Sequence, residues 1–406
     1  MRHARTFYGA LIALLAATAV AMVVAAVSAP GRRGSSGGND LGNPPGMVDR
    51  LDFFESGDDW HRGQRQRVAV STLIMLDDGR NDAFPRTGTW TSPEVSTPFR
   101  FTELLPSWNV TAPKDTGLRL EVRVRAARSG RWSPWLFVGS WGRTPAGERV
   151  TRCRQGVVNV DYVALDVPAD AYQVRVGLFS FDLDKAITPS VRRVAVCYSG
   201  VVKGARFPAE VRPTSGPAWQ CNLPVPFRTQ KDAPKSLSSE ICSPTSVSMV
   251  MAYWGVDRPT VENALAVYDP DNEMFGNWGR AVARAGELGL DSWLARFRDW
   301  DRVRAEIAAG RPVVASVRFK RGEFPSAVLP ETDGHLIVIR GFTPAGDVIV
   351  NDPASRERGD GAVYKADELA RAWFGHGGVG YVICRKAGPA GGTALARRPG
   401  ESATKE

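Results

Sequence analysis

The sequence predicts two domains of different fold class, an all-β antiparallel sandwich at residues 48–204 and an α+β domain at residues 220–385. Two patterns support this division. The first region contains short β-type runs punctuated by Gly and Pro, with little helical periodicity. In the second region helical patterns come first and β-type runs follow. Between them, residues 205–219 are rich in Pro and lack a clear period, which is typical of an interdomain linker.

The N-terminus has the pattern of an export signal. Arg2 and Arg5 precede an uncharged stretch, Thr6–Gly31, that is rich in Ala, Leu and Val. A small-residue cleavage motif ends this stretch, but the Pro that follows would hinder cleavage, and the stretch is long enough to remain as an anchor. We expect residues 1–29 to be a signal peptide or membrane anchor and residues 30–47 a flexible linker. The rest of the protein would be secreted or extracytoplasmic.

The charge pattern indicates a solvated basic surface rather than a nucleic-acid site. The chain of 406 residues carries a formal net charge of +9, but its Arg residues are spread out and form neither a cluster nor a basic helix. We therefore expect no nucleic-acid partner, and membrane contact only through the N-terminal segment. The cysteines are too scattered for a zinc site, and Asp269, Asp271 and Glu273 lack calcium-loop spacing, so no metal or other cofactor is expected.

The number of cysteines is odd, which matters for an exported protein. In an oxidising compartment the five cysteines would leave one thiol unpaired. We expect Cys153 to pair with Cys197 in the first domain, and Cys221 to pair with Cys384 across the second. Cys242 would then be the free thiol.

The first domain rests on a series of β-type runs. They are Val68–Met75, Leu118–Ala126, Trp135–Trp141, Val157–Leu165, Tyr172–Phe179 and Val191–Tyr198. The run Leu118–Arg125 alternates strictly between apolar and charged residues, as expected of a strand with one face in water. The domain also concentrates tryptophans, namely Trp90, Trp108, Trp132, Trp135 and Trp141. Such a cluster is typical of a sandwich core, but it could also bind a cell-envelope polymer or protein.

The second domain is expected to open with a helix at Pro244–Trp254, closed by Gly255 at the C′ position. The apolar stripe of this helix consists of Val247, Val250, Met251 and Trp254. Further helices are expected at Thr260–Tyr268, Trp278–Leu288 and Trp300–Ala309. The β-type runs that follow are Pro312–Phe319, His335–Phe342, Val348–Asn351 and Val379–Cys384. The Gly- and Ala-rich tail, residues 386–406, is expected to be disordered.

Cys242 is the strongest candidate for chemistry. It directly precedes Ser243 and Pro244, and Pro fits the first turn of a helix, so Cys242 should lie at the helix N-terminus. There the unpaired N–H groups and the positive end of the helix dipole favour a thiolate, the form that acts as a nucleophile. The alternative is a small buried hydrophobic residue or half of a disulfide.

His335 can serve as the base, because it begins an apolar strand that a hairpin turns back toward acidic residues. In one hairpin register Phe342 pairs with Asp347. Asp352 then lies diagonal to His335 on the same face of the sheet. A one-residue slip brings Asn351 to that face instead. Either side chain could orient the imidazole, but not both, since neighbours in a strand point to opposite faces.

Gln230 is a candidate for stabilising the oxyanion of acyl transfer. Its side-chain amide and the backbone N–H of Cys242 could together bind the negative charge that develops on the carbonyl oxygen. Residue type alone does not assign this role, because most glutamines are surface residues.

Several short stretches, taken together in their order and spacing, resemble a known family. They are Cys242–Ser246, Gly276–Trp278, Ala309–Val313, Gly334–Val338 and Asn351–Ala354. On these stretches, residues 225–383 resemble the papain-like cysteine peptidases similar to the bacteriocin-processing, family-39 group. The resemblance implies a papain-like fold for the second domain. It also implies site roles: nucleophile Cys242, base His335, orienting acid Asp352 and oxyanion residue Gln230.

The resemblance has two departures. The interval between Gln230 and Cys242 is longer than is typical of papain-like enzymes. No transporter segment or ATPase adjoins the matching region, so bacteriocin maturation is not expected. The first domain resembles, more loosely, the β-rich modules found ahead of such peptidase domains in exported bacterial proteins.

These observations predict an exported thiol hydrolase that acts on a peptide or protein substrate. It would cleave peptide or related amide bonds through a Cys-His-Asp triad and a thioester acyl-enzyme. An acyltransferase or amidase would use the same nucleophile. The alternative of a different class is a catalytically silent cell-envelope binding protein that uses the β-sandwich. The intact set of Cys242, His335 and Asp352 speaks against it, because a silent protein has no chemical need for all three.

Overall fold

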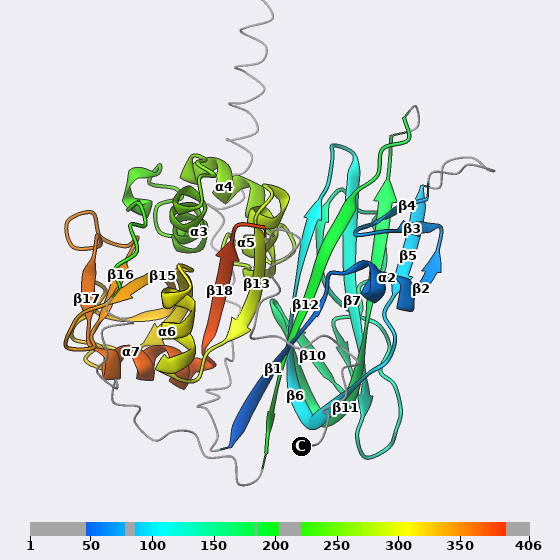
Figure 1. Ribbon diagram of the computed structural model, residues 1–406, viewed down its shortest axis with the longest axis horizontal. Coiled ribbons are helices and arrows are strands. Elements are labelled where there is room, and N and C mark those ends of the chain that lie inside the picture. Colours follow the sequence, from blue (N-terminus) through cyan, green and yellow to red (C-terminus); the bar gives the residue numbers. More distant parts are fainter. Residues whose placement is uncertain (1–45, 78–85, 183–184, 203–220, 387–406) are drawn as a thin grey trace, which may run out of the picture.

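The computed structural model describes residues 46–77, 86–182, 185–202 and 221–386 (Figure 1). The expected export segment, almost all of the linker after it, the interdomain linker and nearly all of the C-terminal tail lie outside these residues. Within the described residues, a β-rich domain and a domain of helices packed on a sheet lie side by side. This arrangement places the ends of several strands of both domains around one cleft.

The described residues of the N-terminal domain form a twelve-stranded sheet in which every pairing is antiparallel. Its strands are β1 (Met47–Phe54), β2 (Gln64–Gln66), β3 (Val68–Val70), β4 (Ile74–Leu76), β5 (Thr87–Thr91), β6 (Val95–Thr111), β7 (Thr116–Ala126), β8 (Leu136–Gly142), β9 (Arg152–Cys153), β10 (Gly156–Asn159), β11 (Tyr162–Ser180) and β12 (Ser190–Val201). One short helix, α2 (Gly57–Arg62), interrupts the series. The predicted β-rich, antiparallel character is confirmed.

The long strand β6 explains why these strands do not divide into two sheets. Its first half pairs with β11 and its second half pairs with β12. Because β6 continues from one partner to the next, the hydrogen bonding links the described strands into one network. The two separately bonded sheets of the expected sandwich are therefore not seen in the described residues.

Side-chain alternation in β7 follows the sequence pattern. Leu118, Leu120, Val122 and Val124 are fully buried, whereas the intervening charged residues face away from the core. The tryptophans singled out above mostly belong to the core, and the buried ones are Trp90, Trp108 and Trp141. Trp132 and Trp135 are half-buried, and the guanidinium carbon of Arg123 lies 4.8 Å from the centroid of each ring. These cation–π contacts favour packing over a sugar-binding platform.

The C-terminal domain combines helices with a sheet of antiparallel strands, six in the described residues. The helices are α3 (Cys242–Tyr253), α4 (Thr260–Val267), α5 (Trp278–Glu287), α6 (Trp300–Ala308) and α7 (Ala366–Trp373). The strands, in sheet order, are β13 (Asp291–Arg296), β18 (Val379–Cys384), β14 (Val313–Phe319), β15 (Thr332–Phe342), β16 (Val348–Asn351) and β17 (Ala362–Tyr364). Every predicted element of this domain is found with its ends within about three residues of those expected. The elements β13, β17 and α7 have no predicted counterpart.

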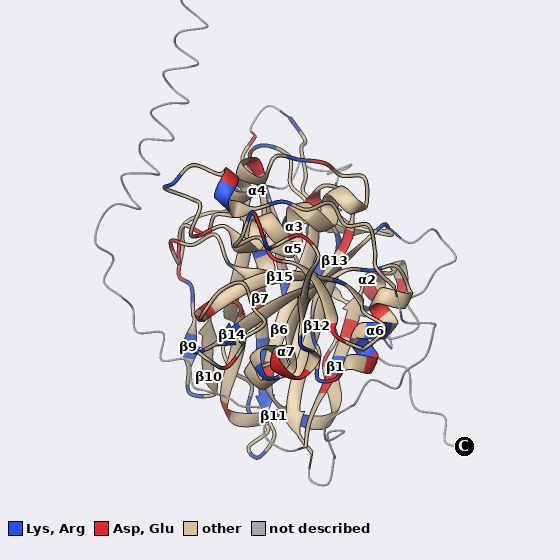
Figure 2. Ribbon diagram, turned by 90° about the vertical axis from the view of Figure 1, so that its left-hand side faces the viewer, with Lys and Arg blue, Asp and Glu red and all other residues tan. Residues whose placement is uncertain are grey.

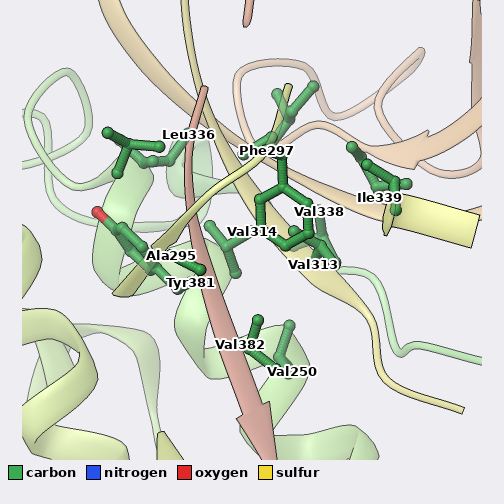
Figure 3. Packing of buried hydrophobic residues seen from close by; sticks show 14 of the residues in the cluster. Val250, Ala295, Phe297, Val313, Val314, Leu336, Val338, Ile339, Tyr381 and Val382 are labelled. Atoms are coloured by element: carbon green, nitrogen blue, oxygen red, sulfur yellow. The ribbon is translucent and has the colours of Figure 1, made fainter. Parts of the chain in front are cut away.

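Helix α3 is the central helix of this domain. Val250 of α3 lies beside Val382 and belongs to the same hydrophobic cluster as Val314 and Val338, so the cluster joins the helix to three neighbouring strands (Figure 3). Every residue from 243 to 251 is buried, so α3 is held on all sides rather than along one stripe. Its predicted end is confirmed, because Gly255 adopts a φ of +88° just after the helix. The helix therefore holds its N-terminus rigidly.

The two domains pack through a shared interior. Asn109 of β6 donates through Nδ2 to the carbonyl of Ser292 at 2.8 Å and accepts from the N–H of Ser292 at 3.1 Å. Gly279 of α5 lets Trp108 approach closely, since a Cβ on this glycine would lie 3.1 Å from the Trp108 ring. These contacts place β13 and α5 directly against β6 and β12 (Figure 1). The position of one domain on the other is thus fixed by buried groups.

The described surface carries charges of both signs. Figure 2 shows Lys and Arg interspersed with Asp and Glu rather than gathered on one face. Other charged residues form buried pairs between the domains, such as Arg298 Nε with Asp49 Oδ2 at 2.8 Å. Among the described residues, no helix has the length and apolarity needed to cross a membrane.

The structure contradicts the predicted disulfides, because all five cysteines lie in described segments and are free thiols. Cys153 is in β9 and Cys197 is in β12. The pairing runs β9-β10-β11-β6-β12, which separates the two strands by four steps of about 4.8 Å each. A disulfide needs Cα atoms within about 7 Å of each other. With three strands between them, these two cysteines are not bridged in the structure.

The second predicted pair also has no bridge. Cys221 and Cys384, which lies in β18 opposite Asp291, are both free in the structure. Cys242 is unpaired, as expected, but so are the other cysteines.

Candidate active site

Cys242 lies at the N-terminus of α3, as predicted. The helix begins at Cys242, two residues earlier than expected, with Ile241 as its N-cap residue. The N–H of Thr245 donates to the carbonyl of Ile241 at 3.0 Å, so the N–H groups before it are not used by the helix. The first turn, which the structure describes in full, contains no acidic side chain. The positive end of the helix dipole is therefore available to a thiolate.

The hairpin that follows His335 begins one residue out of the expected register. Phe342 pairs with Val348, so the predicted pairing of Phe342 with Asp347 is wrong. Asp347 instead closes the turn, where its carbonyl accepts from the N–H of Thr343 at 2.8 Å. The turn is thus one residue longer than the sequence suggested.

A β-bulge restores the expected register before the site is reached. The shift falls at Arg340, and beyond it Val338 pairs with Asn351. The next positions in this register are Ile337 and Asp352, which is the pairing expected to bring Asp352 to the face of His335. The bulge is therefore what aims the carboxylate at the imidazole.

Asn351 faces the other side of the sheet. It is fully buried, and its Nδ2 donates to the carbonyl of Val225 at 3.0 Å. Its Oδ1 accepts from the N–H of Gly361 at 3.1 Å. Of the two candidates that the sequence left open, the structure brings Asp352 to His335 and gives Asn351 contacts to neighbouring backbone.

His335 and Asp352 form a buried pair. Nε2 of His335 lies 2.8 Å from Oδ1 of Asp352, and the side chains are 5% and 2% exposed. Burial by itself lowers the pKa of His335, but the charge and hydrogen bond of Asp352 and the contact with Cys242 raise it to about 10. Cys242 lies near enough to His335 to contribute to this raised pKa, and Nε2 of the imidazole faces Asp352. The imidazole thus lies between thiol and carboxylate.

The Asp352 carboxylate is held by further donors. The N–H of Ala354 donates to Oδ1 at 2.8 Å, and the hydroxyl of Tyr364 donates to Oδ2 at 2.6 Å. Burial opposes ionisation of Asp352, yet His335, Tyr364 and the Ala354 N–H together lower its pKa. Tyr364 was not among the predicted site residues, because it reaches the site only through the pairing of β17 with β16.

The contact between α3 and β15 holds the nucleophile near the base. Ser246, one turn along α3 from Cys242, donates from Oγ to the carbonyl of Leu336 at 3.0 Å. Leu336 directly follows His335 in β15. This buried hydrogen bond sets the first turn of α3 against the start of β15, which keeps Cys242 within reach of His335.

Gln230 is hydrogen-bonded to two segments, one that follows Asp352 and one that leads to Cys242. It begins a short 3-10 turn (Gln230–Asp232) and is 4% exposed. Its N–H donates to the carbonyl of Pro353 at 3.0 Å, and its Nε2 donates to the carbonyl of Ser238 at 2.8 Å. One amide hydrogen is therefore used by the segment that leads to Cys242. The buried Oε1 has no hydrogen-bond partner among the described residues.

Cys242 opens onto a cleft of about 470 Å³ that both domains line. Lining residues from the C-terminal domain include Cys242, Met274, Phe275, Trp278, Val317 and Leu336. Those from the N-terminal domain are Met47, Glu103, Asn159, Val160, Asp161 and Tyr162. The second group was missed by sequence reasoning, since nothing in a β-type run indicates which turn will face another domain.

The described residues thus form two domains, and the second brings a cysteine, a histidine and an aspartate together beside a cleft. Residues 222–381 match the sequence model of the Peptidase C39 like family, and residues 50–199 match that of the Peptidase C39 N-terminal domain. The second domain is therefore similar to the C39-like peptidases over most of its length, and the first is similar to the N-terminal domain of such peptidases. No curated protein matches the chain.

Solved structures include C39-like proteins with low identity. A C39-like peptidase from Bacillus anthracis is 15% identical, with 41% of this chain and 99% of that chain covered and a TM-score of 0.33. A double glycine motif protease from an AMS/PCAT transporter, in complex with its leader peptide, is 18% identical. That match covers 41% of this chain and 96% of the other, with a TM-score of 0.28.

Proposed function

We propose that the protein is an exported cysteine peptidase that cleaves peptide or related amide bonds through Cys242, His335 and Asp352. The observation that supports this most is the continuous series of contacts from the thiol to the imidazole to the carboxylate, with the thiol open to a cleft. The match to the C39-like family supports the reaction class. The packing of α3 against the strand that carries His335 supports a papain-like layout.

In the first half of the proposed reaction, His335 already holds the proton that comes from Cys242, and the Cys242 thiolate attacks the scissile carbonyl carbon. The new S–C bond forms as the carbonyl electron pair moves onto oxygen. The N–H of Cys242 and the amide of Gln230 are proposed to bind this oxyanion. When the intermediate collapses, the C–N bond breaks, the amine leaves with the proton from His335, and a thioester remains.

In the second half, a water molecule attacks the thioester while His335 takes its proton. The C–S bond then breaks, the carboxylic acid product leaves, and the Cys242 thiol is regenerated. Asp352 keeps the imidazole oriented and stabilises its positive charge in both halves. An acyltransferase or amidase would share the thioester step and differ only in the acceptor or leaving group.

Selective alkylation tests this function. The protein is treated with limiting iodoacetamide near neutral pH, and the alkylated cysteines are identified by peptide mapping. Cys242 should react first, and this preference should be lost in His335→Ala, because the imidazole activates the thiol. The other cysteines in the same molecule serve as internal controls. Reaction of Cys242 at the rate of Cys221, or a rate that His335→Ala leaves unchanged, would contradict the proposal.

Export is the part of the proposal that rests on the N-terminal sequence pattern alone. The expected result is recovery of the protein outside the cytoplasm of the producing cell. Replacing Arg2 and Arg5 by Glu should reduce that recovery, because the basic region before an apolar stretch directs export. A cytoplasmic location of the unchanged chain would contradict it.

A further inference from the structure

The hairpin between β10 and β11 reaches from the N-terminal domain into the cleft of Cys242. Residues 159–162, at the tip of this hairpin, line the same cavity as the thiol. The opposite side of the cavity belongs to the C-terminal domain, including Trp278 and Leu336. A substrate that reaches Cys242 along this cleft must therefore pass between the two domains.

The hairpin tip is tied to the peptidase domain by two contacts to one residue. Oδ1 of Asp161 accepts from the backbone N–H of Trp278 at 2.6 Å, at the N-terminus of α5. The ring of Tyr162 stacks on the ring of Trp278, with centroids 6.4 Å apart and an interplanar angle of 14°. Both rings are half-buried, so each keeps part of its surface open at the cleft. The tip is thus a fixed wall of the cleft.

Val160 is held at this tip in a strained conformation. Its φ is +55°, in the left-handed region that β-branched residues rarely adopt. Glycine would fit this turn without strain. Strain of this kind persists only where the surroundings impose it, and it concentrates at ligand and active sites. A Val side chain at the tip therefore points to a role in the cleft that Gly could not fill.

The chemistry of the cleft favours an apolar group. Two of its arginines form buried pairs, Arg296 with Glu103 at 2.6 Å and Arg298 with Asp49 at 2.8 Å, and the partly exposed Arg318 lies 3.9 Å from Asp333. The remaining lining includes many apolar side chains from both domains, namely Met47, Val160, Tyr162, Met274, Phe275, Trp278, Val317, Leu336 and Val379. The rest of the lining is mostly polar or charged and includes Asn159, Glu240 and Arg318. An apolar side chain placed among the apolar residues would be stabilised by burial, whereas a charged one would lose water there.

We propose that the cleft is an interdomain subsite for an apolar side chain near the scissile bond of a peptide. Val160 and Tyr162 of the N-terminal domain are its specificity-determining residues. The proposal rests on the proposed function in taking Cys242 as the nucleophile that marks the scissile bond. It adds that the peptidase domain alone forms only half of the binding site.

The test compares peptides that differ in one side chain. A fluorogenic peptide series carries Leu or Asp in turn at each position flanking the scissile bond. Wild type should prefer Leu at one position, and Val160→Gly and Tyr162→Ala should each lower kcat/KM for that Leu peptide by about 10-fold, mainly through KM. The Asp peptide should change by less than about twofold. Val157→Ala, in the same hairpin but outside the cleft lining, is the matched control and should change neither.

Two further measurements keep this test independent of folding and of catalysis. Val160→Gly relieves the left-handed strain and should leave the melting temperature equal or higher, so its loss of kcat/KM cannot come from unfolding. Binding of the Leu peptide to Cys242→Ala protein, followed by fluorescence, should weaken about 10-fold when Val160→Gly or Tyr162→Ala is added. An unchanged dissociation constant in both double variants would overturn the subsite. If these affinities change while wild type shows no turnover, the proposed function fails and the subsite stands.

Discussion

The two walls of the cleft are built in different ways. The wall that carries Cys242, His335 and Asp352 comes from one domain and is held by buried hydrogen bonds of 2.6 to 3.0 Å. The facing wall comes from the other domain, and its main part is a hairpin tip that is held through Asp161 and Tyr162. This difference suggests that bond cleavage and substrate selection can be changed separately. Substitutions in the first wall should lower kcat, whereas those in the second should raise KM.

Replacing the nucleophile should give the largest difference between the effect on kcat and the effect on peptide binding. Cys242→Ala should lower kcat by at least about 10³-fold, because no other group in the cleft can form the thioester. Peptide affinity should remain, since the facing wall is intact. The measurement is hydrolysis of a fluorogenic peptide alongside binding of the same peptide. Cys221→Ala is the control, and turnover by Cys242→Ala at the wild-type rate would refute the mechanism.

Neutralising the orienting carboxylate should have the next largest effect. Asp352→Asn keeps the shape of the side chain but removes the charge that stabilises the imidazolium of His335. We expect kcat to fall by about 10³-fold with little change in KM. Asp347→Asn, at the other end of the same hairpin and paired with Lys365 on the surface, is the control and should be nearly silent. Equal activity of the two variants would remove Asp352 from the reaction.

The oxyanion assignment should give a smaller loss. Gln230→Ala removes one donor, and we expect kcat to fall by about 10²-fold while KM stays the same. The structure offers a competing role, since Gln230 donates to the carbonyl of Ser238. If Gln230 acts only through this hydrogen bond, Gln230→Ala will unfold at a lower temperature but retain its kcat. Measuring the melting temperature and kcat on the same sample distinguishes the two.

The contact between His335 and Asp352 could be predicted because both residues lie in one hairpin. Strand alternation left only two candidates for the orienting residue. The pairing of two strands across a short turn can be worked out by counting residues from that turn. The turn itself was misjudged by one residue at Phe342, and the bulge at Arg340 compensated for the error. Sequence spacing does not reveal a bulge, so the final choice of Asp352 depended on the family resemblance.

Features that join distant segments could not be predicted in the same way. The predicted pairing of Cys153 with Cys197 followed from the number of cysteines, which carries no information on the strands that lie between them. Tyr364 and Tyr162 reach the site through tertiary contacts whose partners lie far along the chain. The division of the β-rich domain into two sheets is not confirmed for a similar reason, since partner exchange along one long strand depends on the whole domain.

The buried pair should also be visible in stability. The pKa of His335 in the folded protein is about 10, above its ordinary value of 6.5, so the pair stabilises the fold fully below pH 6.5. That stabilisation is lost as pH rises through about 10. In urea unfolding, the difference in unfolding free energy between wild type and His335→Gln should shrink by more than about 1 kcal/mol from pH 6.5 to pH 10. A difference that does not vary with pH would mean that His335 is neutral in the fold.

The smallest effect should come from the outermost member of the hydrogen-bonded series. Tyr364→Phe removes the donor to Oδ2 of Asp352 without changing the packing of the ring. We expect a loss of about 1–3 kcal/mol in the free energy of unfolding, because a buried carboxylate oxygen loses its partner. Tyr253→Phe is the matched control, since its hydroxyl donates to the carbonyl of Gly310, away from the site. Both variants should lose stability, but only Tyr364→Phe should lower kcat, since only it loosens the carboxylate that orients His335. An equal kcat in the two variants would mean that Tyr364 contributes only to stability. Asp352 would then be the last residue of the hydrogen-bonded series that affects catalysis.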